Sequence, residues 1–219
     1  MHDTVPESSL RRPLAAAKPL PALYAELAAR ERELTELRAR LAGLRAFAFR
    51  VDPVIAAERQ PFDLMAAVQA ALDSTRTDLG GNFLSLHVPP VQVYASLAAI
   101  TQVLVHLLVN AATAMRGTGR PGVLHVDAAA LGSRVRVRVS DNGPGVAPAV
   151  LGQLFEPFSS RRGAGLELGL GLTISSAIVR AHGGTLTCSN RVPHGARFAF
   201  DLLNAQVNPA DATLPETQK

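Results

Sequence analysis

The chain has 219 residues, enough for one medium-sized domain with an appendage, and 47% of them are hydrophobic, which provides for a substantial core. Its net charge is +4, but basic and acidic residues are interspersed and only 5% are aromatic, which argues against a base-stacking surface for nucleic acid. The single cysteine, Cys188, excludes an internal disulfide framework and a thiolate metal site. We recognise neither a signal peptide nor an apolar run long enough to span a bilayer, so we expect a cytoplasmic protein.

The chain has three regions that differ in composition and in hydrophobic periodicity. Residues 1–58 are rich in Ala, Leu, Arg and Glu with helical periodicity, and residues 59–203 alternate strand-like and helix-like patterns. Residues 204–219 are polar and aperiodic, which predicts a disordered tail. The pattern predicts an α+β domain preceded by helices.

In the first region, leucines follow alternating spacings of three and four on a helix predicted over about 22–50, with Arg30 interrupting the series. The seam consists of Leu23, Leu27, Leu34, Leu37, Leu41 and Leu44. Such a helix could dock on its own domain, or it could pair with a second copy, and the regular seam favours the dimer. Pro19 and Pro21 interrupt helical structure, so a short helix over 8–17 would fold against the long one as a helical hairpin.

The second region contains both helical and strand signals. Helices are predicted over 64–72, 96–115, 147–154 and 170–181, and strands over 83–88, 91–94, 123–128, 133–140, 184–189 and 197–203. In the strand over 133–140, valines alternate with arginines. That alternation predicts a sheet with one buried face and one wet face.

Four clusters in this region carry candidate chemistry. Asn110 lies late in an apolar helix, where an unpaired amide would cost about 1–3 kcal/mol and where its oxygen is a ligand suited to magnesium. Asp141-Asn-Gly143-Pro-Gly145 directly follows a strand, and alone it would be an ordinary turn. Two further clusters come next in the chain, residues 155–158 (Phe-Glu-Pro-Phe) and the glycine-rich residues 163–172, which open a helix. A glycine-rich helix start can present backbone amides to phosphate.

Together and in this order, the four clusters resemble those of the ATP-binding domain of sensor histidine kinases. That family, which shares a superfamily with the ATPase domains of DNA gyrase, MutL and the ninety-kilodalton heat-shock chaperones, has an asparagine box, Asp-x-Gly-x-Gly, Phe-x-Pro-Phe and Gly-x-Gly-Leu-Gly-Leu. The resemblance covers about residues 60–203. It implies a two-layer α/β sandwich, ATP and Mg²⁺ as ligands, and a bacterial two-component signalling system.

The resemblance also implies roles for individual residues. Asn110 would bind the magnesium ion, and Asp141 would accept a hydrogen bond from the adenine amino group. The loop near the base would contain Gly143 and Gly145. The phosphate side would be shaped by a set of lid and helix-start residues, namely Arg162, Gly169, Leu170, Gly171 and Leu172.

Two positions depart from the family pattern. Glu167 stands where the first glycine of Gly-x-Gly-Leu-Gly-Leu is usual, and a carboxylate there would repel triphosphate unless it faces solvent or metal. His106, one turn before Asn110, replaces a residue that is usually asparagine. We expect a packed helix histidine, with a catalytic imidazole as the alternative.

The phosphoacceptor histidine of the family has no counterpart here. Residues 8–14 (Ser-Ser-Leu-Arg-Arg-Pro-Leu) fit the frame His-Glu-x-x-Asn/Gln-Pro-Leu through their leucines and Pro13, which places Ser8 at the histidine and Ser9 at the acid. Imidazole is a good nucleophile near pH 7, whereas a serine hydroxyl needs a base. We therefore expect no autophosphorylation of the chain's own hairpin.

Three functions remain open on the sequence. The first is an ATP-binding histidine-kinase homologue that forms a homodimer and acts with a response regulator or a partner kinase. The second is a regulatory scaffold of the pseudokinase kind, without catalysis. The third is an anti-sigma-type serine kinase, which the predicted hairpin opposes.

Overall fold

The computed structural model describes residues 20–55, 57–156 and 170–207. The chain divides into two compact units, Met1–Gly43 and Leu44–Lys219. The predicted short helix over 8–17 lies outside the described residues.

Helix α1 (Leu20–Ile55) is one continuous helix that includes the predicted range 22–50. The four described seam leucines are about half exposed, with 47% for Leu23, 57% for Leu27, 49% for Leu34 and 55% for Leu37. The side chains of Leu41 and Leu44 fall outside the description. Regularly spaced leucines that stay exposed along several turns are typical of a surface that another chain covers.

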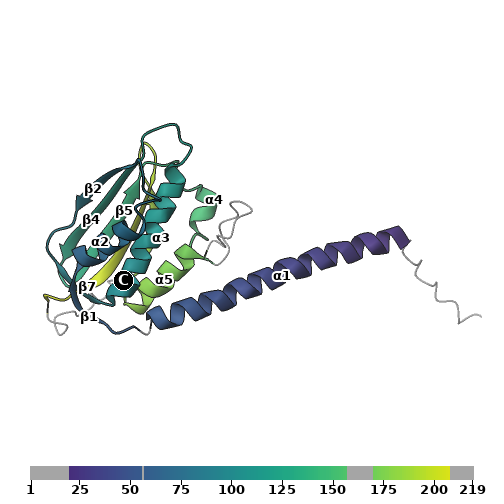
Figure 1. Ribbon diagram of the computed structural model, residues 1–219, viewed down its shortest axis with the longest axis horizontal. Helices are drawn as coiled ribbons and strands as arrows, with labels where there is room; N and C mark the ends of the chain where they lie inside the picture. Colours follow the sequence, from purple (N-terminus) through teal and green to yellow (C-terminus); the bar gives the residue numbers. More distant parts are fainter. Residues whose placement is uncertain (1–19, 56, 157–169, 208–219) are drawn as a thin grey trace, which may run out of the picture. The chain divides into compact units, whose positions relative to one another are not determined.

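The second unit contains one seven-stranded sheet, and Figure 1 shows α2, α3 and α5 gathered against one face of it. The spatial order is β1 (Gln60–Asp63), β3 (Gln92–Ala95), β7 (Ala196–Asn204), β5 (Arg134–Asp141), β4 (Val123–Leu131) and β2 (Phe83–His87), while β6 (Thr187–Asn190) also pairs with β7. β2 is parallel to β4, and the other pairs are antiparallel. The expected fold, an α/β sandwich of two layers, is therefore confirmed.

The helical layer comprises α2 (Leu64–Ser74), α3 (Leu97–Met115) and α5 (Gly171–Ala181), and a short α4 (Pro148–Leu151) lies nearby in sequence. Asp63 caps α2 by accepting from the Met65 amide, and Ser96 caps α3 by accepting from the Ala99 amide. The valines of β5 are at most 1% exposed and pack in one core with α3, whereas the arginines between them are more exposed. The sheet thus has the buried face and the wet face that the alternation predicts.

α3 is also, within the described chain, the one helix long and apolar enough by composition to cross a membrane. Its interior residues, among them Leu104 and Leu107, are buried in the core of this domain. The sequence contains no unbroken apolar run of that length, but polar residues such as Gln102 and Asn110 are few enough for the whole helix to qualify. Core helices have the same composition, so α3 is explained by packing.

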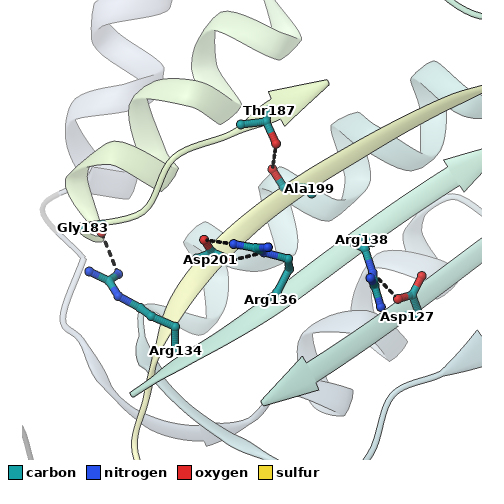
Figure 2. A network of polar contacts seen from close by, with 8 residues as sticks. All are labelled: Asp127, Arg134, Arg136, Arg138, Gly183, Thr187, Ala199 and Asp201. Carbon is teal, nitrogen blue, oxygen red and sulfur yellow. Dashed lines mark hydrogen bonds and ion pairs between the residues drawn. The ribbon is translucent and has the colours of Figure 1, made fainter. Parts of the chain in front are cut away.

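The open face of the sheet carries the network of polar contacts in Figure 2. Arg136 makes a two-point ion pair with Asp201 at 2.7 and 3.0 Å, and Arg138 pairs with Asp127 on β4. Arg134 donates to the carbonyl of Gly183 at 2.7 Å, which ties this face to the turn after α5. Because these pairs are partly solvated, they add little stability and mainly keep the face polar.

Three segments differ from the sequence-based expectation in a way that has a physical reason. Residues 60–63 form the edge strand β1, where proline is tolerated because the outer amides face solvent. The helix expected over 147–154 is only four residues long and ends at Gly152. The tail expected over 204–219 does not include Asn204, which is the last residue of β7 and whose side chain binds the Gly132 carbonyl and the Gln206 amide. Residues 208–219 lie outside the described chain.

His182 is 2% exposed and connects the start of α3 to the end of α5. Its Nε2 accepts from the Ser96 amide at 3.2 Å and its Nδ1 donates to the Ile178 carbonyl at 2.8 Å. This bonding fixes the neutral tautomer with the proton on Nδ1. Burial lowers the pKa of His182, the Ile178 bond opposes this effect, and the positive charge of Arg59 adds to it.

We predict that His182 makes folding sensitive to mild acid. Its contribution to the free energy of unfolding should be full above the ordinary histidine pKa of 6.5 and should be lost as pH falls through the lowered folded-state pKa. His182→Gln should cost about 1–3 kcal/mol at pH 7.5 and flatten the pH dependence, measured by urea unfolding between pH 5 and 8. His87→Gln, which removes an exposed histidine, is the control, and an unchanged pH slope in His182→Gln would contradict the prediction.

Candidate functional site

Asp141 is the last residue of β5 and shares the core-facing side of the strand with Val135, Val137 and Val139. It is therefore a carboxylate in a row of valines, and it is only 2% exposed. Its Oδ1 accepts from the Gly143 amide at 2.8 Å and from the Ala196 amide at 3.3 Å.

Desolvation dominates the electrostatics of this carboxyl group. Burial raises the pKa of Asp141, while the two backbone amides and the nearby Arg191 counteract the rise. Oδ1 is committed to the backbone, and no other residue of the described chain is hydrogen-bonded to Oδ2. Asp141 can therefore offer one oriented oxygen to a ligand group that donates a hydrogen bond.

The loop after Asp141 approaches its neighbours too closely for larger residues. A Cβ at Gly143 would lie 2.9 Å from Asp141 Oδ1 and 3.1 Å from the carbonyl oxygen of Ala114 in α3. Gly145 has a φ of +81°, which glycine adopts without strain. The tight fit brings the last turn of α3 against the loop.

Asn110 lies one turn before Ala114 on α3 and is half-buried. The fold thus brings the predicted metal ligand and the Asp141 loop to the same end of the helical layer. The described residues contain no cluster of three or more His, Cys, Asp or Glu side chains that could hold a metal ion. A bound Mg²⁺ would need oxygens from a ligand and from water besides Asn110, which is the usual arrangement for this ion.

His106 connects α3 to the start of α5. Its Nδ1 lies 3.1 Å from Ser175 Oγ and its Nε2 lies 2.7 Å from Gln102 Nε2. A Cβ added at Gly171 would be 3.6 Å from the ring, so the imidazole packs against the first turn of α5. This geometry agrees with a packed helix histidine, and the catalytic alternative stays a hypothesis.

The start of α5 is the candidate phosphate side. Leu170 precedes the helix, Gly171 and Leu172 begin it, and no side chain of the described residues caps it. The Thr173 hydroxyl in this first turn is buried without a hydrogen-bond partner. Free amides and the helix dipole at such an end favour an anion. Arg162, Glu167, Gly169 and Ser8 lie outside the described residues, so their roles stay predictions.

The structure adds residues that the sequence analysis missed. Asn142 accepts from the Val123 amide at 2.9 Å and donates to the Pro121 carbonyl at 2.9 Å, which anchors the start of β4 to the loop. Asn190, the last residue of β6, binds Val146, and Arg191 in the turn that follows donates to the Asp141 carbonyl at 3.2 Å. In the sequence these residues have only the composition of ordinary turns.

The family model described as histidine kinase-, DNA gyrase B-, and HSP90-like ATPase matches residues 96–206. The chain belongs to this ATPase family. The matched segment runs from the cap of α3 to the turn after β7, and it includes every segment of the site. Its folded core is a histidine-kinase-type ATPase domain, the ATP-binding domain of two-component sensor kinases, as the sequence motifs predict.

Individual relatives agree with this assignment. The C4-dicarboxylate transport sensor protein DctB of Rhizobium meliloti (strain 1021) is 35% identical over 149 residues, which are 66% of this chain and 23% of that protein. The structure of the mycobacterial sensor histidine kinase MprB is similar with a TM-score of 0.60 at 25% identity, covering 67% of this chain and 98% of that one. Full-length ShkA, solved with AMPPNP, gives a TM-score of 0.62 at 27% identity, covering 83% of this chain and 39% of that one. The chain spans less than a quarter of the curated relative.

We predict that Gly143 is essential to the shape of the site. Gly143→Ala should shift the loop, because the backbone carbonyl of Ala114 cannot move as a flexible side chain would. Gly152→Ala is the matched control, since its Cβ would meet nothing within 4 Å and its φ of −68° suits alanine. Thermal unfolding and ATP titration should show a loss in the first variant and none in the second. Equal behaviour of the two would contradict the close approach.

Proposed function

We propose that the domain binds ATP with Mg²⁺ and serves phosphoryl transfer in a two-component signalling system. The observation that carries the proposal is the buried Asp141 carboxylate, whose Oδ1 is bound to two backbone amides while Oδ2 stays available. A carboxylate oriented in this way accepts from the exocyclic amino group of adenine. Guanine presents a carbonyl at that place, which the carboxylate would repel.

The other site residues would bind different parts of the nucleotide. Gly143 and Gly145 let the loop beside the base fold closely against α3 and Asn190, and the amides at the start of α5 donate to phosphate oxygens. The amide oxygen of Asn110 contributes one ligand to Mg²⁺, which supplies charge neutralisation of the phosphates when bound. His106 and Ser175 hold α3 and α5 together between these two parts.

We predict that ATP binding depends on Asp141. Asp141→Asn should weaken ATP binding about tenfold to a hundredfold, because a hydrogen bond to a charged acceptor is worth about 1.5–3 kcal/mol. Asp201→Asn is the control, since Asp201 is a half-buried carboxylate on the open face. Calorimetric titration with ATP and Mg²⁺ is the measurement. Absence of ATP binding by the unmodified protein would favour the scaffold function instead.

The leucine seam of α1 supports a homodimer. Leu37 is 55% exposed along its helix, and a second copy would cover it and its three described neighbours. This proposal agrees with the helical pairing that the sequence pattern favours over docking on the chain's own domain.

We predict that Leu37→Glu dissociates the dimer, because a carboxylate buried at the seam has no partner to offset its desolvation. Arg38→Glu places the same carboxylate side chain on an adjacent face, with an even larger change in charge, and should leave the dimer intact. Sedimentation equilibrium measures the mass of each variant. A monomeric unmodified protein would remove the dimer hypothesis.

The phosphoryl acceptor is proposed to lie on a partner. Ser8 and Ser9 occupy the positions of the family's histidine and acid, so a response regulator or a partner kinase with its own histidine would complete the pathway. A regulatory pseudokinase that binds ATP without transfer is the alternative.

We predict no acid-labile phosphohistidine on this chain after incubation with radiolabelled ATP and Mg²⁺. Ser8→His combined with Ser9→Glu should restore labelling, because imidazole with a neighbouring acid is the competent nucleophile. An unlabelled double variant would assign the defect to the hairpin or to Glu167, and adding Glu167→Gly would separate these causes. Acid-labile label on the unmodified chain would overturn the assignment of Ser8.

A further inference from the structure

The turn between β6 and β7 is bonded to the Asp141 loop at several points. Asn190, at the end of β6, uses both atoms of its side-chain amide on one residue of the loop. Its Oδ1 accepts from the Val146 amide at 2.8 Å, and its Nδ2 donates to the Val146 carbonyl at 2.8 Å. A side chain thus replaces the pair of backbone bonds that a neighbouring strand would make.

The same amide lies directly over Gly145. A Cβ at Gly145 would be 2.9 Å from Asn190 Oδ1, and the φ of +81° at this glycine turns the chain so that Val146 meets Asn190. The motif glycine and Asn190 therefore form one arrangement. The glycine permits the close approach of the amide, and the asparagine fixes Val146, at the end of the loop, by two hydrogen bonds.

The adjacent turn residues act on the same loop. Arg191 donates to the Asp141 carbonyl at 3.2 Å, and the Arg191 amide donates to the Gly195 carbonyl at 2.9 Å, which closes the turn. Arg120 donates to the Asn142 carbonyl at 3.3 Å and contacts His194 of the turn at 2.6 Å. These hydrogen bonds fix the position of the turn relative to the loop. Asn190, which precedes the turn, contacts the last residue of the loop, Val146.

We propose that Asn190 is a positioning residue for adenine selection, which holds residues 143–146 in the conformation that lets Asp141 read the base. This inference rests on the proposed ATP binding. Asn190 touches no reacting atom in this role and acts through Val146 and Gly145. Without the clamp, the loop must be ordered by the nucleotide itself, and the cost of ordering lowers the affinity for the base that the site recognises.

The test is a pair of variants that keep shape and charge while removing the hydrogen bonds. Asn190→Leu preserves the branching of the side chain and loses both bonds to Val146. Asn204→Leu is the matched control, because Asn204 makes the same kind of two-point clamp at the opposite end of β7, to Gln206 at 3.0 Å and Gly132 at 3.2 Å. Asn190→Ser, which can still accept from the Val146 amide, should recover part of the effect.

The measurements are the Kd for ATP, the Kd for GTP by competition, and the thermal midpoint of each protein. We expect Asn190→Leu to raise the Kd for ATP about fivefold, as the loss of hydrogen bonds worth about 1 kcal/mol implies, while the Kd for GTP changes little. The selectivity for ATP over GTP should fall in Asn190→Leu, be intermediate in Asn190→Ser, and remain in Asn204→Leu even where stability drops. A ratio of two affinities does not move when a variant is only less stable.

The outcomes separate the two proposals. An unmodified protein that binds no ATP overturns the proposed function. An unmodified protein that binds ATP, together with an unchanged selectivity in Asn190→Leu, overturns the positioning role. If Asn190→Leu does not fold, an unchanged selectivity for ATP over GTP in Asn190→Ser overturns the positioning role instead. Equal loss of selectivity in Asn190→Leu and Asn204→Leu would make the effect one of general stability and would also overturn it.

Discussion

The alternation of side chains on β5 is the constraint on which the rest of the domain depends. This strand lies between β4 and β7, so both of its edges are paired and its side chains can only point to one face or the other. Valines fill the core on one side, and arginines meet Asp127 and Asp201 on the other. Because the period is two, Asp141 falls on the valine side and is carried beneath the helical layer, where a carboxylate is otherwise costly.

That cost explains the hydrogen bonds around the site. A buried carboxylate needs donors, and the backbone supplies them from two segments at once, the loop at Gly143 and the start of β7 at Ala196. Each donor segment is fixed by others in turn, Gly143 by its fit against α3 and Ala196 by the turn that contains Arg191. One oxygen of Asp141 is thus bound to the backbone, and the other is hydrogen-bonded to no other residue of the described chain.

The part of the site that lies on α3 and α5 is positioned by side-chain hydrogen bonds between these helices. His182 joins the beginning of α3 to the end of α5, and His106 joins the two helices near the beginning of α5. The two histidines thus tie the pair at both ends, and neutral imidazole suits this task because it can donate and accept at once. Asn110 on α3 and the first turn of α5 take their relative positions from this pairing.

The sequence by itself determined the family, most of the elements in their order and the residues of the four motifs, because periodicity and motif spacing are local properties of the chain. It indicated the buried face of the strand over 133–140 from alternation alone, whereas the extension of β5 to Asp141 and the burial of this carboxylate came from the structure. It did not identify Asn142, Asn190 or Arg191, whose residue types are those of any turn and whose roles exist only because β6, β7 and the Asp141 loop meet in space. Likewise, only the tertiary structure gave His106 and His182 their partners, since hydrogen bonds across 69 and 86 residues of chain leave no local pattern.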